Sequence, residues 1–291
     1  MTTDNTATTG ADEPSTPFRF FDARVLRVRR LSPSLTRVTF GGPGLDGFRS
    51  GGNDQSFSLF LPPPGRAVPD VPGRDGDGWF HAWRAQDPAD RAIMRSYTIR
   101  AQRAGAGGHP EVDVDFALHG DVGPASRWAA NSAPDDRVLL LGPAVEDNKS
   151  VGFRPPPDTD WVLLAADETA IPAVGGILDR LPPDLPALLW LEVPHEDDRH
   201  ALPPLPAHAH AHWSTHGGDP ARRGGLTRAV ADAELPDGRG YAWLAGEAGG
   251  VRALRRHLVH ERGLDRRRIT FSGYWRLGAS EEQLRQEALG G

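Results

Sequence analysis

The chain has 291 residues, of which 38% are hydrophobic and 25% charged, and its net charge is −6; the length favours two domains, because single cores rarely grow beyond ~250 residues. The acidic balance argues against nucleic-acid binding, and the absence of cysteine excludes disulfides, thiolate metal sites and iron–sulfur clusters, so any redox chemistry requires a bound cofactor. No apolar run approaches ~18 residues and no signal peptide is recognisable, so we expect no membrane insertion and a cytoplasmic location.

The N-terminal half is predicted to be a β-barrel. Residues 1–17 lack periodicity and are expected to form a disordered tail. In residues 18–145, short segments that alternate apolar and polar residues are separated by Gly/Pro turns, which predicts an antiparallel Greek-key barrel. Its strands are expected at 24–28, 36–40, 56–61, 112–118 and 137–141, with a polar insertion at 65–91.

The segment from residue 94 to residue 100 is the most informative of these predicted strands. Alternation puts Arg95 and Tyr97 on one face and Ser96 and Thr98 on the other. Such a strand presents a cation for a phosphate, a flat ring for stacking and a short donor for a heterocycle. A flavin nucleotide needs those three groups.

A glycine-containing turn follows the next predicted strand and opens a probable helix. Gly123 lets the backbone approach a ligand closely, and Ala125 and Ser126 lie in the first helical turn. Free N–H groups and the helix dipole favour a phosphate there. An ordinary Ser-capped helix start is the alternative, although Arg95 supplies a second charge suited to a phosphate.

The pattern changes after a stiff, proline-rich linker at 146–158. Residues 159–282 contain continuous apolar strands that alternate with helices, which indicates a parallel, right-handed α/β sheet. We expect strands at 161–166, 187–193, 241–245 and 268–272, and helices at 170–181 and 248–262. Residues 283–291 are expected to be a C-terminal tail.

Two strand-to-helix turns of this domain carry acidic residues at strand ends, where open α/β sheets bind their ligands. Asp167, Glu168 and Thr169 follow the first strand, and Thr169 is expected to cap the next helix and face a nicotinamide ring. Gly246 and Glu247 follow a later strand. Each turn is also compatible with a capped helix start without a ligand.

Two other groups of residues give weaker functional signals. His208, His210 and His212 alternate along one strand face, but no strong fourth ligand is apparent and we expect no metal site. The last strand ends in Tyr274 and Trp275, which suit either a core or an interdomain site.

Taken in order, these segments resemble the siderophore-interacting protein family, the flavin-dependent ferric-siderophore reductases of bacteria within the ferredoxin-reductase superfamily. The resemblance extends over residues 18–282. The matching segments are Arg95–Arg100, Asp115–Asp121, Gly123–Ala129, Ala166–Ala170, Trp243–Ala248 and Ser272–Arg276.

The resemblance implies a FAD-binding barrel and an NAD(P)H-binding α/β domain, with electrons passing from NADPH or NADH through FAD to a ferric siderophore. It implies that Arg95 and the turn Gly123–Ser126 hold the FAD phosphates, that Tyr97 packs on the isoalloxazine, and that Thr98 hydrogen-bonds near it. The cofactor-binding residues that it implies are Arg95, Ser96, Tyr97, Thr98, His119, Gly123, Pro124, Ala125, Ser126, Asp167, Thr169, Ala170 and Glu247, with Glu168 also bordering the nicotinamide pocket. No side chain is expected to act as acid or base on the iron complex.

One position departs from the family pattern. Relatives commonly carry a lysine where this chain has Ser58, and that lysine belongs to a basic cluster that attracts anionic ferric siderophores. Arg127 and Arg276 are the remaining candidates for substrate binding. We therefore expect weaker attraction for triply anionic catecholates, or a less charged substrate.

Two other functions stay open: an electron-transfer flavoprotein fed by ferredoxin, and a siderophore-binding accessory protein without redox activity. The intact set of Arg95, Tyr97 and Thr98 argues against the second. The choice between NADPH and NADH also stays open. Glu192, at the end of the second parallel strand, favours a free ribose hydroxyl, whereas His195, Arg199 and the Arg222–Arg223 pair would accept a 2′-phosphate.

Overall fold

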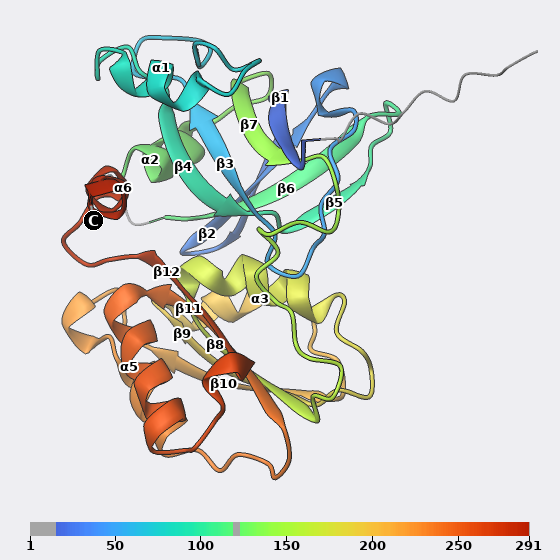
Figure 1. Ribbon diagram of the computed structural model, residues 1–291, viewed down its shortest axis with the longest axis vertical. Coiled ribbons are helices and arrows are strands. Elements are labelled where there is room, and N and C mark those ends of the chain that lie inside the picture. Colours follow the sequence, from blue (N-terminus) through green and yellow to red (C-terminus); the bar gives the residue numbers. More distant parts are fainter. Residues whose placement is uncertain (1–15, 119–122, 291) are drawn as a thin grey trace, which may run out of the picture.

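The structure, a computed structural model, describes residues 16–118 and 123–290, and its N-terminal part is an antiparallel half-barrel (Figure 1). Seven strands are hydrogen-bonded in the order β4-β3-β7-β1-β2-β6-β5. They are β1 (Phe18–Ser32), β2 (Leu35–Gly41), β3 (Ser56–Leu61), β4 (Ile93–Thr98), β5 (Ala101–Ala104), β6 (Pro110–Ala117) and β7 (Arg137–Pro143). The predicted antiparallel barrel is confirmed, and β4 and β5 lie at the two ends of its strand order.

The C-terminal part is a parallel five-stranded sheet in the order β10-β9-β8-β11-β12. Its strands are β8 (Trp161–Asp167), β9 (Ala187–Val193), β10 (Ala209–Thr215), β11 (Gly240–Glu247) and β12 (Ile269–Trp275). Every residue of β8 is buried, because helices cover both faces of a parallel sheet. The predicted α/β sheet is confirmed, and its strand order reverses between β8 and β11.

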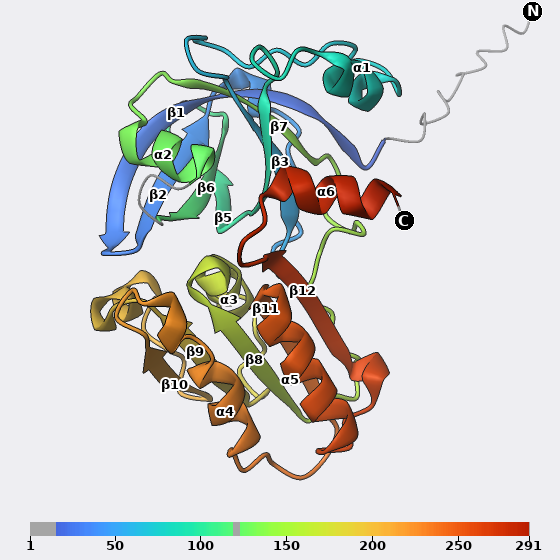
Figure 2. The ribbon, with the colours of Figure 1, turned by 90° about the vertical axis from the view of Figure 1, so that its left-hand side faces the viewer.

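Helices pack on the two faces of this sheet. α3 (Ile171–Leu178) covers one face, where Val174 and Ile177 join the core of β8 and β9. α4 (Gly225–Ala231) and α5 (Ala248–His260) cover the other. Figure 2 shows α3 between the sheet and the half-barrel, so this helix separates the two β layers.

Three further helices flank the half-barrel: α1 (Trp79–Ala85), α2 (Pro124–Asn131) and α6 (Glu281–Gly290). The sequence did not predict α1, which lies in the insertion at 65–91 and packs Trp83 against Phe60 and Met94. The expectation of a tail at 283–291 is wrong as far as residue 290, because α6 is a helix that lies beside β4 (Figure 2). Short 3-10 turns complete the fold at Pro43–Leu45, Glu168–Ala170, Glu196–Ala201, Pro220–Arg222 and Arg266–Arg268.

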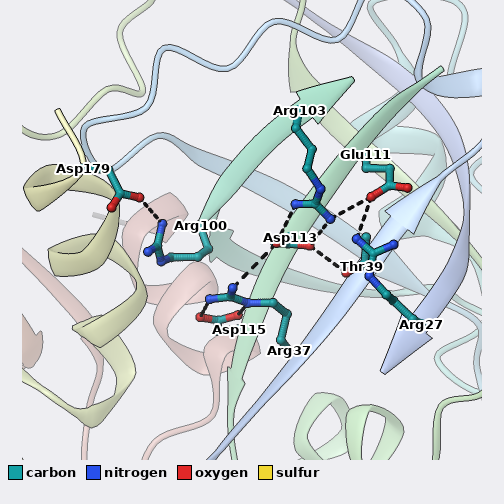
Figure 3. A network of polar contacts seen from close by, with 9 residues as sticks. All are labelled: Arg27, Arg37, Thr39, Arg100, Arg103, Glu111, Asp113, Asp115 and Asp179. Carbon is teal, nitrogen blue, oxygen red and sulfur yellow. Dashed lines mark hydrogen bonds and ion pairs between the residues drawn. The ribbon is translucent and has the colours of Figure 1, made fainter. Parts of the chain in front are cut away.

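A ladder of ion pairs crosses β2, β6 and β5 (Figure 3). Arg37 binds both carboxylate oxygens of Asp115, at 2.6 and 2.8 Å, and Arg103 binds Asp113 at 2.7 Å. Thr39 also donates to Asp113, and these partners hold the pKa of that carboxyl below its usual range despite the opposing effect of burial. The ladder therefore satisfies charged groups on neighbouring strands by cross-strand pairing.

Two further contacts join the half-barrel to the α/β layer. Arg100, just after β4, pairs with Asp179 at the end of α3 at 2.5 Å (Figure 3). Asp198, which is fully buried, accepts hydrogen bonds from the hydroxyl of Ser32 and the backbone N–H of Ser34. Within the described ranges, no helix combines the length and the apolar character needed to span a membrane.

Candidate functional site

β4 has the two faces that alternation predicts. The ring of Tyr97 lies 4.4 Å from that of Phe116, between ring centroids, and packs against the barrel core with Ile93. Met94 belongs to a separate cluster on the other side, with Trp83. β4 is a terminal strand of the sheet, so its outer edge is available to another partner.

That partner is α6. The Arg95 guanidinium contacts Glu282 at 2.5 Å and Glu281 at 3.6 Å. The backbone N–H of Ser96 donates to Glu281 at 3.0 Å, and its hydroxyl does so at 3.2 Å. Burial raises the pKa of Glu281, against the opposing effect of Arg95 and Arg285. Arg95, which the family resemblance assigns to the FAD phosphates, and its neighbour Ser96 thus form an anion-binding group that here binds carboxylates.

The turn Gly123–Ser126, which is the second predicted phosphate-binding element, lies at the start of α2, and α2 packs against β4. Gly123 is the N-cap of α2 and has no side chain to bond the first-turn N–H groups. Pro124 occupies the first turn, and Ala125 and Ser126 are buried within it. A Cβ placed on Gly123 meets no described atom within 4 Å, so the space before the helix is open as far as the structure describes it. The predicted His119 lies outside the described residues.

Thr98 is bound to a buried carboxylate that the sequence did not single out. Its hydroxyl donates to Asp54 at 3.2 Å. Tyr274, from β12, donates to the same carboxylate oxygen, and Trp243, from β11, donates to the other at 3.1 Å. Burial raises the pKa of Asp54 to about 6, although the three donors oppose the rise. One side chain of the half-barrel therefore binds two strands of the α/β sheet.

Asp167, at the end of β8, is buried and saturated with donors rather than directed into a pocket. One oxygen accepts from the backbone N–H and hydroxyl of Thr169, at 3.0 and 2.5 Å. The other accepts from the backbone N–H of Glu247 and the indole N–H of Trp275, both at 2.8 Å. Burial, reinforced by the charge of Glu168, raises the pKa of Asp167 to about 6. The expectation that Thr169 caps a helix is wrong, because Asp167 is the capping acceptor.

Glu168 and Ala170 are also fully buried. Glu168 forms a bidentate ion pair with Arg223, whose guanidinium lies 4.9 Å from the ring centroid of Trp275. At the end of β9, Glu192 is buried and accepts from the backbone N–H of Gly224 at 3.1 Å. The acids at this edge of the sheet therefore hold the turns in place.

Glu247 caps α5 with one carboxylate oxygen, which accepts from Gly249 N–H at 2.6 Å and Gly250 N–H at 2.9 Å. This geometry corresponds to the capped helix start that the sequence left as an alternative. Of the two candidates for substrate binding, Arg276 forms a bidentate ion pair with Glu287 of α6, and Arg127 lies exposed on α2. The structure does not bring these two arginines into one contact group.

The groups around β4 fit a flavin nucleotide in their chemistry. A guanidinium, a backbone N–H and a hydroxyl already bind anions at Arg95 and Ser96. The adjacent α2 begins at Gly123, which has no side chain, and no atom of the described residues lies within 4 Å of a Cβ placed there. Tyr97 and Thr98 follow on the same strand.

Comparison with known proteins gives concordant matches. Residues 24–147 match the family description siderophore-interacting FAD-binding domain, and residues 159–278 match siderophore-interacting protein. The ferric vibriobactin reductase of Vibrio cholerae is 30% identical over 264 residues, which cover 90% of this chain and 91% of that protein. The NADPH-dependent ferric-chelate reductase of Escherichia coli is 28% identical over 88% of this chain and 93% of its own. The crystal structure of a siderophore utilization protein from T. fusca, 33% identical, superposes with a TM-score of 0.75 over 91% of this chain and 95% of its own.

Proposed function

The chain belongs to the siderophore-interacting protein family, and we propose that it reduces ferric siderophores, with FAD as cofactor and NADPH as electron donor. The observation that carries the proposal is the donor set of β4 and α2. Arg95, Ser96, Tyr97 and Thr98 follow one another along a terminal strand, and α2, whose N-cap residue Gly123 has no side chain, packs against that strand. Relatives named for ferric-chelate and ferric vibriobactin reduction support the activity.

Bound FAD would supply the conversion from a two-electron donor to a one-electron acceptor, because it accepts a hydride from NADPH and passes electrons singly to Fe(III). One NADPH then reduces two ferric ions and releases one proton. Fe(II) is held far more weakly than Fe(III) by the oxygen ligands of siderophores. Reduction therefore releases iron without destroying the chelator.

The residues of this chain position the reactants. In the proposal, Arg95, the N–H of Ser96 and the first turn of α2 bind phosphate oxygens. Tyr97 offers a ring already fixed against Phe116, and the Thr98 hydroxyl is oriented by Asp54. No side chain needs to donate a proton to the iron complex, because the iron atom only gains an electron. The reaction then requires a cytoplasmic location, where NADPH is available.

The carboxyl edge of the α/β sheet supports NADPH rather than NADH. The Glu192 carboxylate is bound by backbone N–H groups and is buried, so it is not presented to a ribose hydroxyl. Arg222 is exposed, and its guanidinium lies beside Gly217 in the loop after β10. A Cβ added to Gly217 would be 3.8 Å from that guanidinium. A 2′-phosphate would find this cation at the end of a parallel strand.

Anaerobic titration of the FAD-loaded protein tests the cofactor and the donor together. We expect the flavin absorbance at about 450 nm to bleach faster with NADPH than with NADH. Arg222→Gln should reduce that preference, whereas Arg66→Gln, on the half-barrel insertion, should not. A protein that binds no flavin, or a flavin reduced only by reduced ferredoxin, would contradict the proposal.

A further inference from the structure

α6 connects the α/β sheet back to the half-barrel. It follows β12 of the α/β sheet, yet it packs against β4, the terminal strand of the half-barrel (Figures 1 and 2). Glu281 and Glu282 form its first turn. The chain therefore returns from the nucleotide-type sheet to the strand that carries the predicted flavin contacts.

The contacts between α6 and β4 are ionic and specific. Arg95 pairs with both glutamates, and Ser96 donates its N–H and its hydroxyl to the same Glu281 oxygen. Arg285, one turn later, pairs with Glu281 at 2.9 Å and lies over the ring of Trp83, 5.7 Å from the centroid. The Arg95 side chain is only 12% exposed.

These donors have the chemistry of a phosphate site. A guanidinium, a backbone N–H and a hydroxyl bind carboxylate and phosphate oxygens alike, and charged acceptors make the strongest such bonds. The Arg95 side chain is largely buried, and N–H groups of Arg95 and Ser96 are already bonded to Glu282 and Glu281. A second anion cannot bind these N–H groups without displacing a glutamate. Glu281 and Glu282 therefore stand where the proposed function needs phosphate oxygens.

We propose that α6 is an internal competitor of FAD: its first-turn glutamates bind Arg95 and Ser96, and FAD binding displaces them from these donors. The inference rests on the proposed function, because it assumes that Arg95 and Ser96 serve the flavin phosphates. The helix shields the edge of β4 when it is docked. The affinity for FAD then depends on the fraction of molecules in which α6 is released.

FAD binding to the flavin-free 291-residue protein tests this competition. If α6 is docked in nine molecules out of ten, Glu281→Gln combined with Glu282→Gln should lower the Kd for FAD about tenfold. Riboflavin, which has no phosphate, should bind wild type and variant within about twofold of each other. Glu287→Gln is the control for a Glu→Gln substitution on α6, because it also removes a glutamate charge but its partner is Arg276 rather than β4; its FAD affinity should equal that of wild type.

Hydrogen exchange of residues 281–290 provides a second measurement on the wild-type protein. FAD addition should accelerate exchange of the α6 amides, because the first turn loses its contacts with β4. An unchanged FAD affinity in the double variant, or slower exchange of α6 with FAD, would overturn the inference while leaving the proposed function intact. A wild-type protein and a double variant that both fail to bind FAD would overturn the proposed function and the inference with it.

Discussion

Asp54 brings together side chains from separate parts of the chain. Its carboxylate receives hydrogen bonds from Thr98 on β4, Trp243 on β11 and Tyr274 on β12. A buried carboxylate with three donors remains costly to ionise, and burial is the largest influence on its pKa. The residue that orients the predicted flavin-contacting hydroxyl is therefore also sensitive to pH.

The pH dependence of stability follows from that pKa. The native carboxyl binds its proton up to about pH 6, whereas the unfolded one loses it near 3.8. Stability due to Asp54 is thus greatest at low pH and is lost as the pH rises through about 6, by an amount of about 3 kcal/mol. Asp54→Asn does not titrate and cannot accept from Trp243, so its deficit relative to wild type should shrink as the pH rises.

Chemical denaturation of wild type and Asp54→Asn, at pH values from about 4 to about 7, measures this difference. Asp167 titrates in both proteins and cancels in the comparison. A difference in unfolding free energy that stays constant, or that grows with pH, would refute the assignment.

The sequence singled out Thr98 as a candidate but not its hydrogen-bond partner Asp54. The donors of Asp54 lie 44, 189 and 220 residues away, and no local pattern reports such contacts. Alternation predicts the neighbouring strand Ser56–Leu61, yet Asp54 lies two residues before that strand and carries no periodic signal. The same reason applies to Arg95. The sequence predicts that Arg95 binds an anion, but it does not indicate that Glu281 and Glu282 are its partners.

At the scale of elements, the ion-pair ladder of Figure 3 stabilises the fold because its charged groups are buried, and the number of its pairs matters less. The side chain of Asp115 is 3% exposed and binds Arg37 in a bidentate manner. Removal of one partner leaves a buried charge without compensation, which is far more costly than loss of an exposed pair.

Arg37→Met should therefore destabilise the protein by about 3–5 kcal/mol. The matched control is Arg24→Met, which breaks an ion pair with Asp135 whose side chains are 52% and 76% exposed; it should cost less than about 1 kcal/mol. Thermal or chemical unfolding at neutral pH measures both variants. Equal effects of the two substitutions would contradict this account of the ladder.

The elements that could be predicted are those whose own sequence carries a period or a continuous apolar run. The half-barrel strands alternate, and β8 is apolar throughout because both of its faces are covered. α1 and α6 lack such signals. α6 is mostly polar, and its position depends on ion pairs with a strand more than 180 residues earlier. α1 is fixed by aromatic contacts across the half-barrel, such as that between Trp83 and Phe60.

At the scale of the whole molecule, the charge around β4 bears on the choice of substrate. Ser58, where the family resemblance leads us to expect a lysine, lies directly across from Ser96 in the β3–β4 pair. Ser96 in turn contacts Glu281. Position 58 therefore neighbours a carboxylate and has no positive charge of its own, which disfavours a highly anionic chelate.

Steady-state kcat/KM values for a ferric hydroxamate and a ferric catecholate measure this preference. We expect the hydroxamate to be favoured, and Ser58→Lys to shift the ratio toward the catecholate by about threefold to tenfold. Val68→Lys adds the same charge on the insertion and should leave the ratio unchanged. A marked preference of the wild-type protein for the ferric catecholate would contradict this expectation.

The most direct measurement of the central claim counts ferrous ions released per NADPH consumed, without oxygen, in the presence of an Fe(II) chelator. The FAD-loaded protein should release two Fe(II) for each NADPH oxidised, because one hydride carries two electrons and each ferric ion accepts one. The flavin-free protein should release none. Oxidation of NADPH without ferrous iron, or equal iron release with and without FAD, would contradict a flavin-dependent ferric-siderophore reductase.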